Sequence, residues 1–202
     1  MITSLIVSTV LFFTPAKEDR QIINGPETTV QMDSISWMSI EEINKIVEKN
    51  IKKNKVKTDK LILVDFYTDW CGWCHKLDQT TYKDSAVIDL MNKYFYAVKF
   101  DAELRDTIQF ANVIYGYKGS GTRVTNDFAL TMASRPGGRI GYPTMTIITP
   151  LGEKITAEGG YKDPAKMVLM LKYYGEGYYK TMDFQTFLTQ KPKEITAPAF
   201  SD

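Results

Sequence analysis

This chain of 202 residues has the length of one domain with appendages, and a second full domain is less expected. Hydrophobic residues make up 44% and charged residues 24%, a balance that excludes a wholly disordered or collagen-like chain. The formal charge of +1 leaves no overall field for holding nucleic acid or an anionic membrane surface. Two cysteines and one histidine are too few for a four-ligand Cys/His zinc site or for a multi-bridge disulfide scaffold.

The N-terminus carries an uncharged apolar run over residues 2–13. It is shorter than the ~20 residues that span a bilayer, but it has the length of the apolar core of a secretory signal. The small residue Ala16 and a charged stretch follow it. We therefore expect a signal peptide over 1–16, an N-terminal extension over 17–38, and a periplasmic or secreted protein. A buried strand or the start of a helix is the alternative for the apolar run.

Two patterns predict the first helix and strand of the following domain. Ser39 and Glu42 have the spacing of a capping box, and apolar residues follow at helical intervals, so a helix is expected at about 39–53. Leu61–Tyr67 is apolar apart from Asp65, which is typical of a strand covered on both faces.

The next segments continue this alternation and then lose it. Asp84 or Ser85 can cap a second helix, and residues 95–100 form a second predicted strand. Residues 102–142 are glycine-rich, so we expect an irregular insertion with a short helix around 126–134.

The last part of the domain predicts a hairpin and a helix. Residues 144–149 and 154–157 form strands joined by a Pro-Leu-Gly-Glu turn, and Asp163 caps a helix. The apolar face expected for that helix contains Met167, Leu171, Tyr174 and Tyr178. Apolar residues at 184–188 suggest a short packing segment. The order predicts an α/β fold with a mixed sheet covered by helices, a domain over 39–181 and a tail over 182–202.

The unusual chemistry is concentrated between Cys71 and His75, directly after the predicted strand. Two intervening residues allow Cys71 and Cys74 to form a disulfide across one helical turn. At a helix N-terminus the first cysteine faces unpaired N–H groups and the positive end of the macrodipole, which favours its thiolate. Cys71 is therefore the expected nucleophile, open to a partner, and Cys74 is the more buried resolving cysteine. His75, four residues after Cys71, either favours that thiolate or points to water.

Two separate motifs carry a resemblance to a known family. The first is Val-Asp-Phe at 64–66 followed by Trp-Cys-Gly-Trp-Cys-His-Lys at 70–76, and the second is Gly-Tyr-Pro-Thr at 141–144. Together they resemble the thioredoxin superfamily, and more narrowly its bacterial branch, which includes the C-terminal domain of the transmembrane thiol-disulfide transporter. The resemblance covers about 39–175 and implies a thioredoxin-like fold, with the insertion at 102–142 ahead of a cis-proline strand.

The resemblance also implies roles for individual residues. Asp65 matches the buried acid that relays the proton of the second cysteine, and burial among apolar residues should raise its pKa. Lys99 falls where the family often places a lysine near that acid. Pro143 matches the cis-proline that faces the cysteines, beside backbone that pairs with an extended substrate. The implied substrate-binding residues are Trp70, Gly72, Trp73, Tyr142 and Pro143.

Trp73 departs from the family pattern, since a proline is common at that place between the cysteines. The segment Cys71–His75 also spells the C-x-x-C-H attachment motif of c-type haem, and the strand before it, Asp65 and Pro143 favour the thiol function instead. A structural disulfide and a non-catalytic thioredoxin-like interaction module are further alternatives. The predicted function is a thiol-disulfide oxidoreductase that acts on protein thiols and disulfides. It needs no metal or organic cofactor and no nucleic acid, and a membrane thiol transporter is a possible electron partner.

Overall fold

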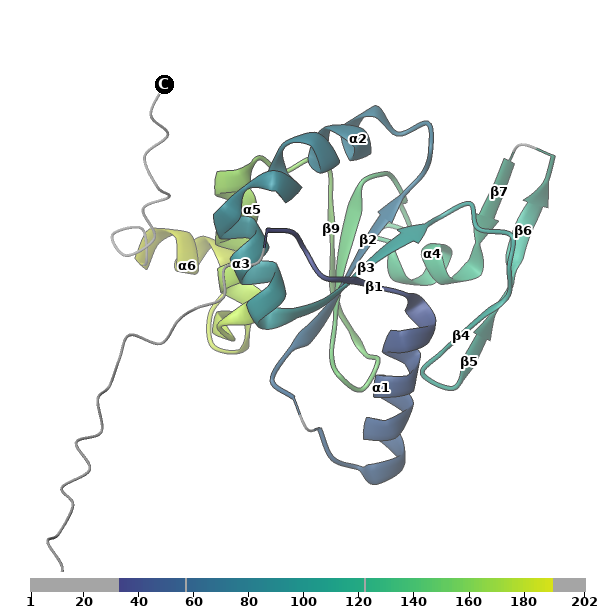
Figure 1. The fold of residues 1–202 in the computed structure, drawn as a ribbon, viewed down its shortest axis with the longest axis horizontal. Coiled ribbons are helices and arrows are strands. Elements are labelled where there is room, and N and C mark those ends of the chain that lie inside the picture. Colours follow the sequence, from purple (N-terminus) through teal and green to yellow (C-terminus); the bar gives the residue numbers. More distant parts are fainter. Residues whose placement is uncertain (1–32, 57, 122, 191–202) are drawn as a thin grey trace, which may run out of the picture. The chain divides into compact units, whose positions relative to one another are not determined.

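A five-stranded mixed sheet forms the centre of the described chain, which comprises residues 33–56, 58–121 and 123–190 of a computed structural model (Figure 1). Its strands, in spatial order, are β1 (Trp37–Met38), β3 (Phe95–Asp101), β2 (Leu61–Tyr67), β8 (Thr144–Ile148) and β9 (Lys154–Gly159). The first three are parallel, and β8 and β9 run antiparallel to their neighbours. The predicted signal peptide and the first part of the predicted extension lie outside the described residues.

Helices cover both faces of this sheet, which confirms the predicted architecture (Figure 1). One face carries α1 (Ile40–Lys53) and α4 (Asp127–Met132); the other carries α2 (Gly72–Gln79), the 3-10 turn η1 (Thr81–Lys83), α3 (Ser85–Tyr94) and α5 (Pro164–Gly175). The central strand β2 is apolar on both sides because Leu61 and Leu63 pack under α3 and α5, whereas Ile62 and Val64 face α1. No helix of the described chain is long and apolar enough to cross a membrane.

The predicted capping box begins α1. The Ser39 hydroxyl accepts a hydrogen bond from the Glu42 amide at 3.2 Å, and the Ser39 amide donates to the Glu42 carboxylate at 2.8 Å. These two bonds satisfy amides that the helix leaves unpaired. Ile43 and Val47 lie fully buried on the inner face, so the helix stands where its sequence predicted it.

The insertion over 102–142 is not irregular throughout, so that prediction is wrong for residues 108–126. It folds into two antiparallel hairpins, β4 (Ile108–Phe110) with β5 (Val113–Tyr115) and β6 (Tyr117–Ser120) with β7 (Arg123–Asn126), and then into the predicted helix α4. Phe110 and Phe128 are fully buried against each other at 5.2 Å between ring centroids. The Ala111 amide donates to the Asn44 side chain, so the first hairpin is tied to α1.

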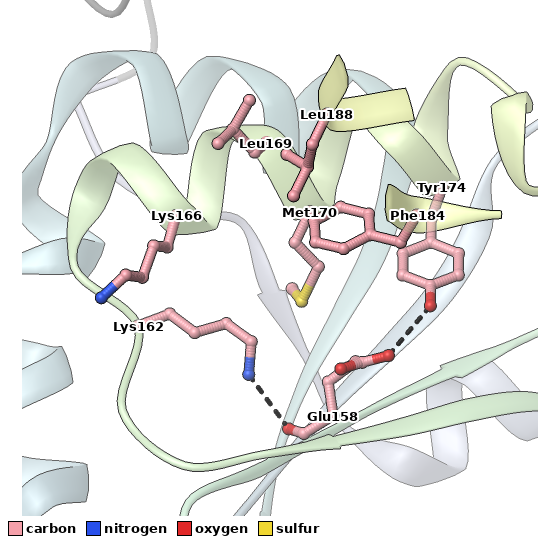
Figure 2. A pocket seen from close by; sticks show the side chains of 8 residues that line it. All are labelled: Glu158, Lys162, Lys166, Leu169, Met170, Tyr174, Phe184 and Leu188. Atoms are coloured by element: carbon pink, nitrogen blue, oxygen red, sulfur yellow. Dashed lines mark hydrogen bonds between the residues drawn. The ribbon is translucent and has the colours of Figure 1, made fainter. Parts of the chain in front are cut away.

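The end of the domain differs in one detail from its prediction. Asp163 caps α5 as expected, but α5 ends at Gly175, and Tyr178 lies beyond it in the 3-10 turn η2 (Tyr178–Lys180), so it does not share the predicted face. Gly177, with φ 81°, turns the chain there. The predicted packing segment is the helix α6 (Phe184–Gln190), whose Phe187 is fully buried. A hollow of about 320 Å³ lies between β9, α5 and α6 (Figure 2).

Candidate active site

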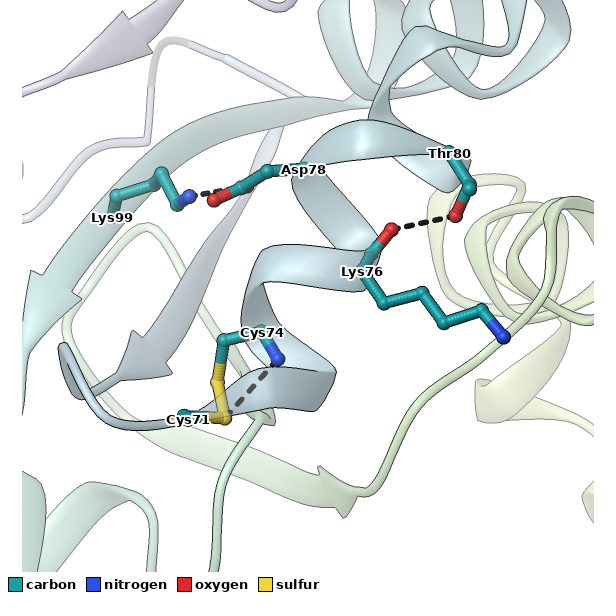
Figure 3. Close-up of polar contacts among 6 residues, drawn as sticks. All are labelled: Cys71, Cys74, Lys76, Asp78, Thr80 and Lys99. Atoms are coloured by element: carbon teal, nitrogen blue, oxygen red, sulfur yellow. Dashed lines mark hydrogen bonds and ion pairs between the residues drawn. A yellow bond between two sulfur atoms is a disulfide. The ribbon is translucent and has the colours of Figure 1, made fainter.

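The two cysteines lie where β2 gives way to α2. Cys71 is the N-cap of α2, and its sulfur accepts a hydrogen bond from the Cys74 amide at 3.1 Å. Cys71 and Cys74 are joined in a disulfide, with Cα atoms 5.2 Å apart (Figure 3). The pair therefore occupies the electropositive N-terminus of a helix.

Cys71 is a buried residue in this disulfide form. The exposed fraction is 5% for Cys71 and 3% for Cys74, so exposure hardly distinguishes them. The Cys71 sulfur is bonded to Cys74 and accepts a hydrogen bond from the Cys74 amide of α2. Solvent-exposed residues surround it instead: Gly72 is exposed, and Trp70 and Trp73 have exposed fractions of 69% and 57%.

Each of the two tryptophans contacts a tyrosine from a distant part of the chain. Trp70 packs edge-on against Tyr142 at 6.1 Å between centroids, and its indole N–H donates to Glu103 at 3.0 Å. Trp73 packs against Tyr161 at 5.5 Å, and the ammonium of Lys76 lies over both of those rings. Exposed aromatic surface of this kind is typical of a binding site.

The turn before β8 lies at the same end of the sheet as the cysteines, because Thr144 pairs with Phe66 near the end of β2. The Tyr142–Pro143 peptide bond is cis, and the Pro143 carbonyl accepts a hydrogen bond from the Gly160 amide at 2.8 Å. Neither the amide nor the carbonyl of Tyr142 hydrogen-bonds to another described residue. These two groups are therefore available to an incoming extended chain.

Asp65 is buried in the middle of β2, on the face covered by α2. Burial raises its pKa from the ordinary 3.8 to about 6, and the charge of Lys99 and the hydroxyl of Tyr82 oppose that shift. One carboxyl oxygen, Oδ1, has no hydrogen-bond partner in the described chain. A carboxyl in this state exchanges a proton near neutral pH, as a proton relay requires.

Lys99 lies opposite Asp65 in the β2–β3 ladder but forms its ion pair with Asp78 on α2 (Figure 3). The negative charge of Asp78 in turn raises the pKa of Asp65. The sequence analysis missed Asp78 and Tyr82. Asp78 follows Cys74 by four residues, one helical turn, and that spacing could have revealed it.

Lys162 is a further residue that the sequence analysis missed. It lies between β9 and α5, where its ammonium donates to the Glu158 and Gly159 carbonyls at 3.4 and 3.3 Å (Figure 2). Burial lowers its pKa, and the charges of Glu158 and Asp65 act in the opposite direction. Its separation of almost a hundred residues from Asp65 leaves no local pattern to find it by.

The histidine of the motif binds to the backbone. Nε2 of His75 lies 2.8 Å from the Asp69 carbonyl, to which it donates. This bond ties α2 to the loop that precedes Cys71.

Comparison with known proteins agrees with this geometry. Residues 47–175 match the thioredoxin-like domain family, so the chain belongs to the thioredoxin-like family. It is 28% identical over 120 residues to a protein disulfide-isomerase of Triticum aestivum, and this alignment covers 59% of the chain and 18% of that relative's length.

Two solved bacterial structures are also similar. A putative disulphide-isomerase of Bacteroides thetaiotaomicron is 28% identical with a TM-score of 0.47, covering 73% of this chain and 98% of that one. The DsbD C-terminal domain of Neisseria meningitidis is 17% identical with a TM-score of 0.41, covering 67% and 97%. The match to the family confirms the predicted resemblance to the thioredoxin superfamily, and the narrower resemblance to its bacterial branch stays a prediction.

Proposed function

We propose that this protein is a thiol-disulfide oxidoreductase that exchanges electrons with protein substrates through Cys71 and Cys74. The observation that carries the proposal is the disulfide at the N-terminus of α2 in a thioredoxin-like chain. A cysteine at a helix N-terminus is a good nucleophile and a good leaving group, and a second cysteine one turn away can displace a bound partner.

The reaction is two successive exchanges. The Cys71 thiolate attacks a substrate disulfide, a bond forms between the two sulfurs, and the second substrate sulfur leaves as a thiolate that takes up a proton. Cys74 then loses its proton to the Asp65 carboxylate and attacks the Cys71 sulfur. The Cys71–Cys74 disulfide re-forms, the substrate leaves as a dithiol, and two electrons have passed to it. The same steps in reverse oxidise a substrate dithiol.

Substrate binding would use the residues around the disulfide. The unpaired amide and carbonyl of Tyr142 offer an extended chain two backbone hydrogen bonds beside Pro143. Trp70 and Trp73, with exposed Gly72 between the cysteines, supply apolar contact. Because Cys71 itself is 5% exposed, docking would have to bring the substrate sulfur close against the start of α2.

The apolar run over 2–13 supports a periplasmic or secreted location, where disulfide exchange has substrates. In such a compartment a reductase needs electrons from outside. A membrane thiol transporter is the partner that the resemblance to a transporter domain suggests.

Reduction of insulin disulfides by dithiothreitol, with the protein as catalyst, tests this function. Cys71→Ser should abolish catalysis, and Cys74→Ser should accumulate a mixed disulfide through Cys71, visible as a mass increase that a reductant reverses. Full activity in both variants would overturn the proposal. Unchanged partner capture by Cys71→Ser without wild-type catalysis would indicate an interaction module, and a Soret band in the purified protein would indicate haem attachment.

A further inference from the structure

Arg135 carries a guanidinium group that pairs with no carboxylate in the described chain. It follows α4, in the loop that leads to the cis-proline turn. Its Nε is fully covered and has no hydrogen-bond partner there. A guanidinium presents five donors in a planar fork, and the unmatched, covered Nε of Arg135 costs free energy that a ligand can recover.

Two glycines fix the position of this group. A Cβ placed on Gly159 would lie 2.6 Å from Nη1 and 2.7 Å from Cζ of Arg135, and a Cβ on Gly141 would lie 3.3 Å from Nη2. The guanidinium therefore lies directly on the backbone of both residues. Gly141 precedes the Tyr142–Pro143 bond, and Gly159 pairs with Thr144 just after it.

The charges around the cis-proline turn are unevenly distributed. Glu103 and Asp101 lie near enough to Tyr142 to raise its pKa, after the larger effect of burial, and Glu103 also binds the Trp70 indole. Arg135, in contrast, lies on Gly141, and it is close enough to Lys162 to lower the pKa of that amine. An acidic group on a bound chain is repelled by Glu103 and Asp101 and attracted to Arg135.

We propose that Arg135 binds a carboxylate of the substrate, supplied by an acidic residue close to the substrate cysteine in an extended segment at the cis-proline turn. The inference rests on the proposed oxidoreductase function and adds a substrate class to it. The free backbone groups of Tyr142 place such a segment beside Gly141, and the guanidinium fork matches a carboxylate in a bidentate arrangement.

The test uses the full chain with Cys74→Ser, so that the reaction stops at the mixed disulfide. Two peptides differ only in Glu or Gln beside a cysteine blocked as its 2-thiopyridyl disulfide. The Cys71 thiolate attacks the peptide sulfur, the Cys71–peptide bond forms, and 2-thiopyridine leaves and is measured by absorbance. The Glu peptide should react about five times faster than the Gln peptide, and added salt should reduce that ratio.

Substitutions then locate the effect. Arg135→Gln should bring the ratio of the two rates close to one. Gly159→Ala should lower it as well, because the new methyl group displaces a guanidinium that is still present. The matched control is Arg139→Gln, which removes an equal charge from an exposed residue of the same loop and should keep the wild-type ratio. Both peptides are measured on one sample, so the protein concentration cancels in the ratio.

The outcomes separate the two proposals. Carboxylate binding by Arg135 is overturned if the wild-type protein reacts equally fast with both peptides, or if the rate ratio falls equally in the Arg139→Gln and Arg135→Gln variants. In either case a fast reaction with the Gln peptide still supports the oxidoreductase function. If neither peptide reacts with Cys71, the oxidoreductase function itself is lost, and the inference falls with it.

Discussion

The ammonium of Lys99 pairs with Asp78 on α2, although its neighbour across the ladder of β2 and β3 is Asp65. The buried carboxyl is thus left without an ion pair within 4 Å in the described chain, and burial raises its pKa to about 6. This division of charge keeps Asp65 able to take up and release a proton close to neutral pH.

The raised pKa of Asp65 has a consequence for stability. The folded protein binds this proton more tightly than the unfolded chain, so the stabilisation is complete below pH 3.8 and is lost as the pH rises through about 6. Asp65→Asn cannot ionise, so between pH 4 and pH 7.5 the variant should gain about 2 kcal/mol relative to wild type. Urea unfolding of both oxidised proteins across this range measures the difference. Parallel pH profiles would contradict the prediction.

The two charges of the Lys99–Asp78 ion pair should shift the pKa of Asp65 in opposite directions. Lys99→Met removes a nearby positive charge and should raise that pKa, whereas Asp78→Asn removes a negative charge and should lower it. Carbon NMR titration of the Asp65 carboxyl reads both shifts directly. The exposed Asp89 on α3 provides the control, since Asp89→Asn should leave the titration in place. Shifts of the same sign in the first two variants would refute this account.

Loss of the capping box at the start of α1 should destabilise the protein. Ser39→Ala removes the acceptor of the Glu42 amide and should lower the free energy of unfolding by about 1 kcal/mol. Ser85→Ala makes the same chemical change at an exposed position of α3 that is not an N-cap, and it should cost much less. Chemical denaturation compares the two, and equal losses would mean that the cap contributes nothing.

The packing of α6 makes residues beyond the predicted domain end part of the core. Phe187 is fully buried against Tyr173 and Tyr178, at 5.3 and 5.0 Å between centroids, so Phe187→Ala should destabilise the protein by about 3–5 kcal/mol. Gln185→Ala on the exposed side of the helix is the control. A thermal transition that is identical in both variants would show that α6 lies outside the cooperative unit.

The elements that were predictable have local signals. A pattern of a few residues predicts each of these elements: Ser39 with Glu42 for α1, the apolar run for β2, and the Asp163 cap for α5. The hairpins at 108–126 carry no such signal, because their strands are only three or four residues long and β6 is exposed throughout. An alternating pattern of apolar and polar residues cannot be recognised over so few positions.

The candidate site divides in the same way. Cys71, Cys74 and Asp65 lie in one stretch of ten residues and could be predicted from their spacing and the family resemblance. Lys162 and Arg135 come from loops far along the chain from the cysteines, and only the folded backbone brings Lys162 near Asp65 and Arg135 onto Gly159. The burial of Cys71 was also beyond the sequence, because it depends on how its sulfur turns onto α2.

Trp70 and Trp73 stand immediately beside the cysteines of the disulfide in the sequence, and both residues are exposed. A disulfide quenches the emission of an adjacent indole far more strongly than two thiols do. Opening the sulfur–sulfur bond should therefore brighten the protein's own ultraviolet fluorescence, and the oxidation state of the molecule can be followed in real time without an added dye.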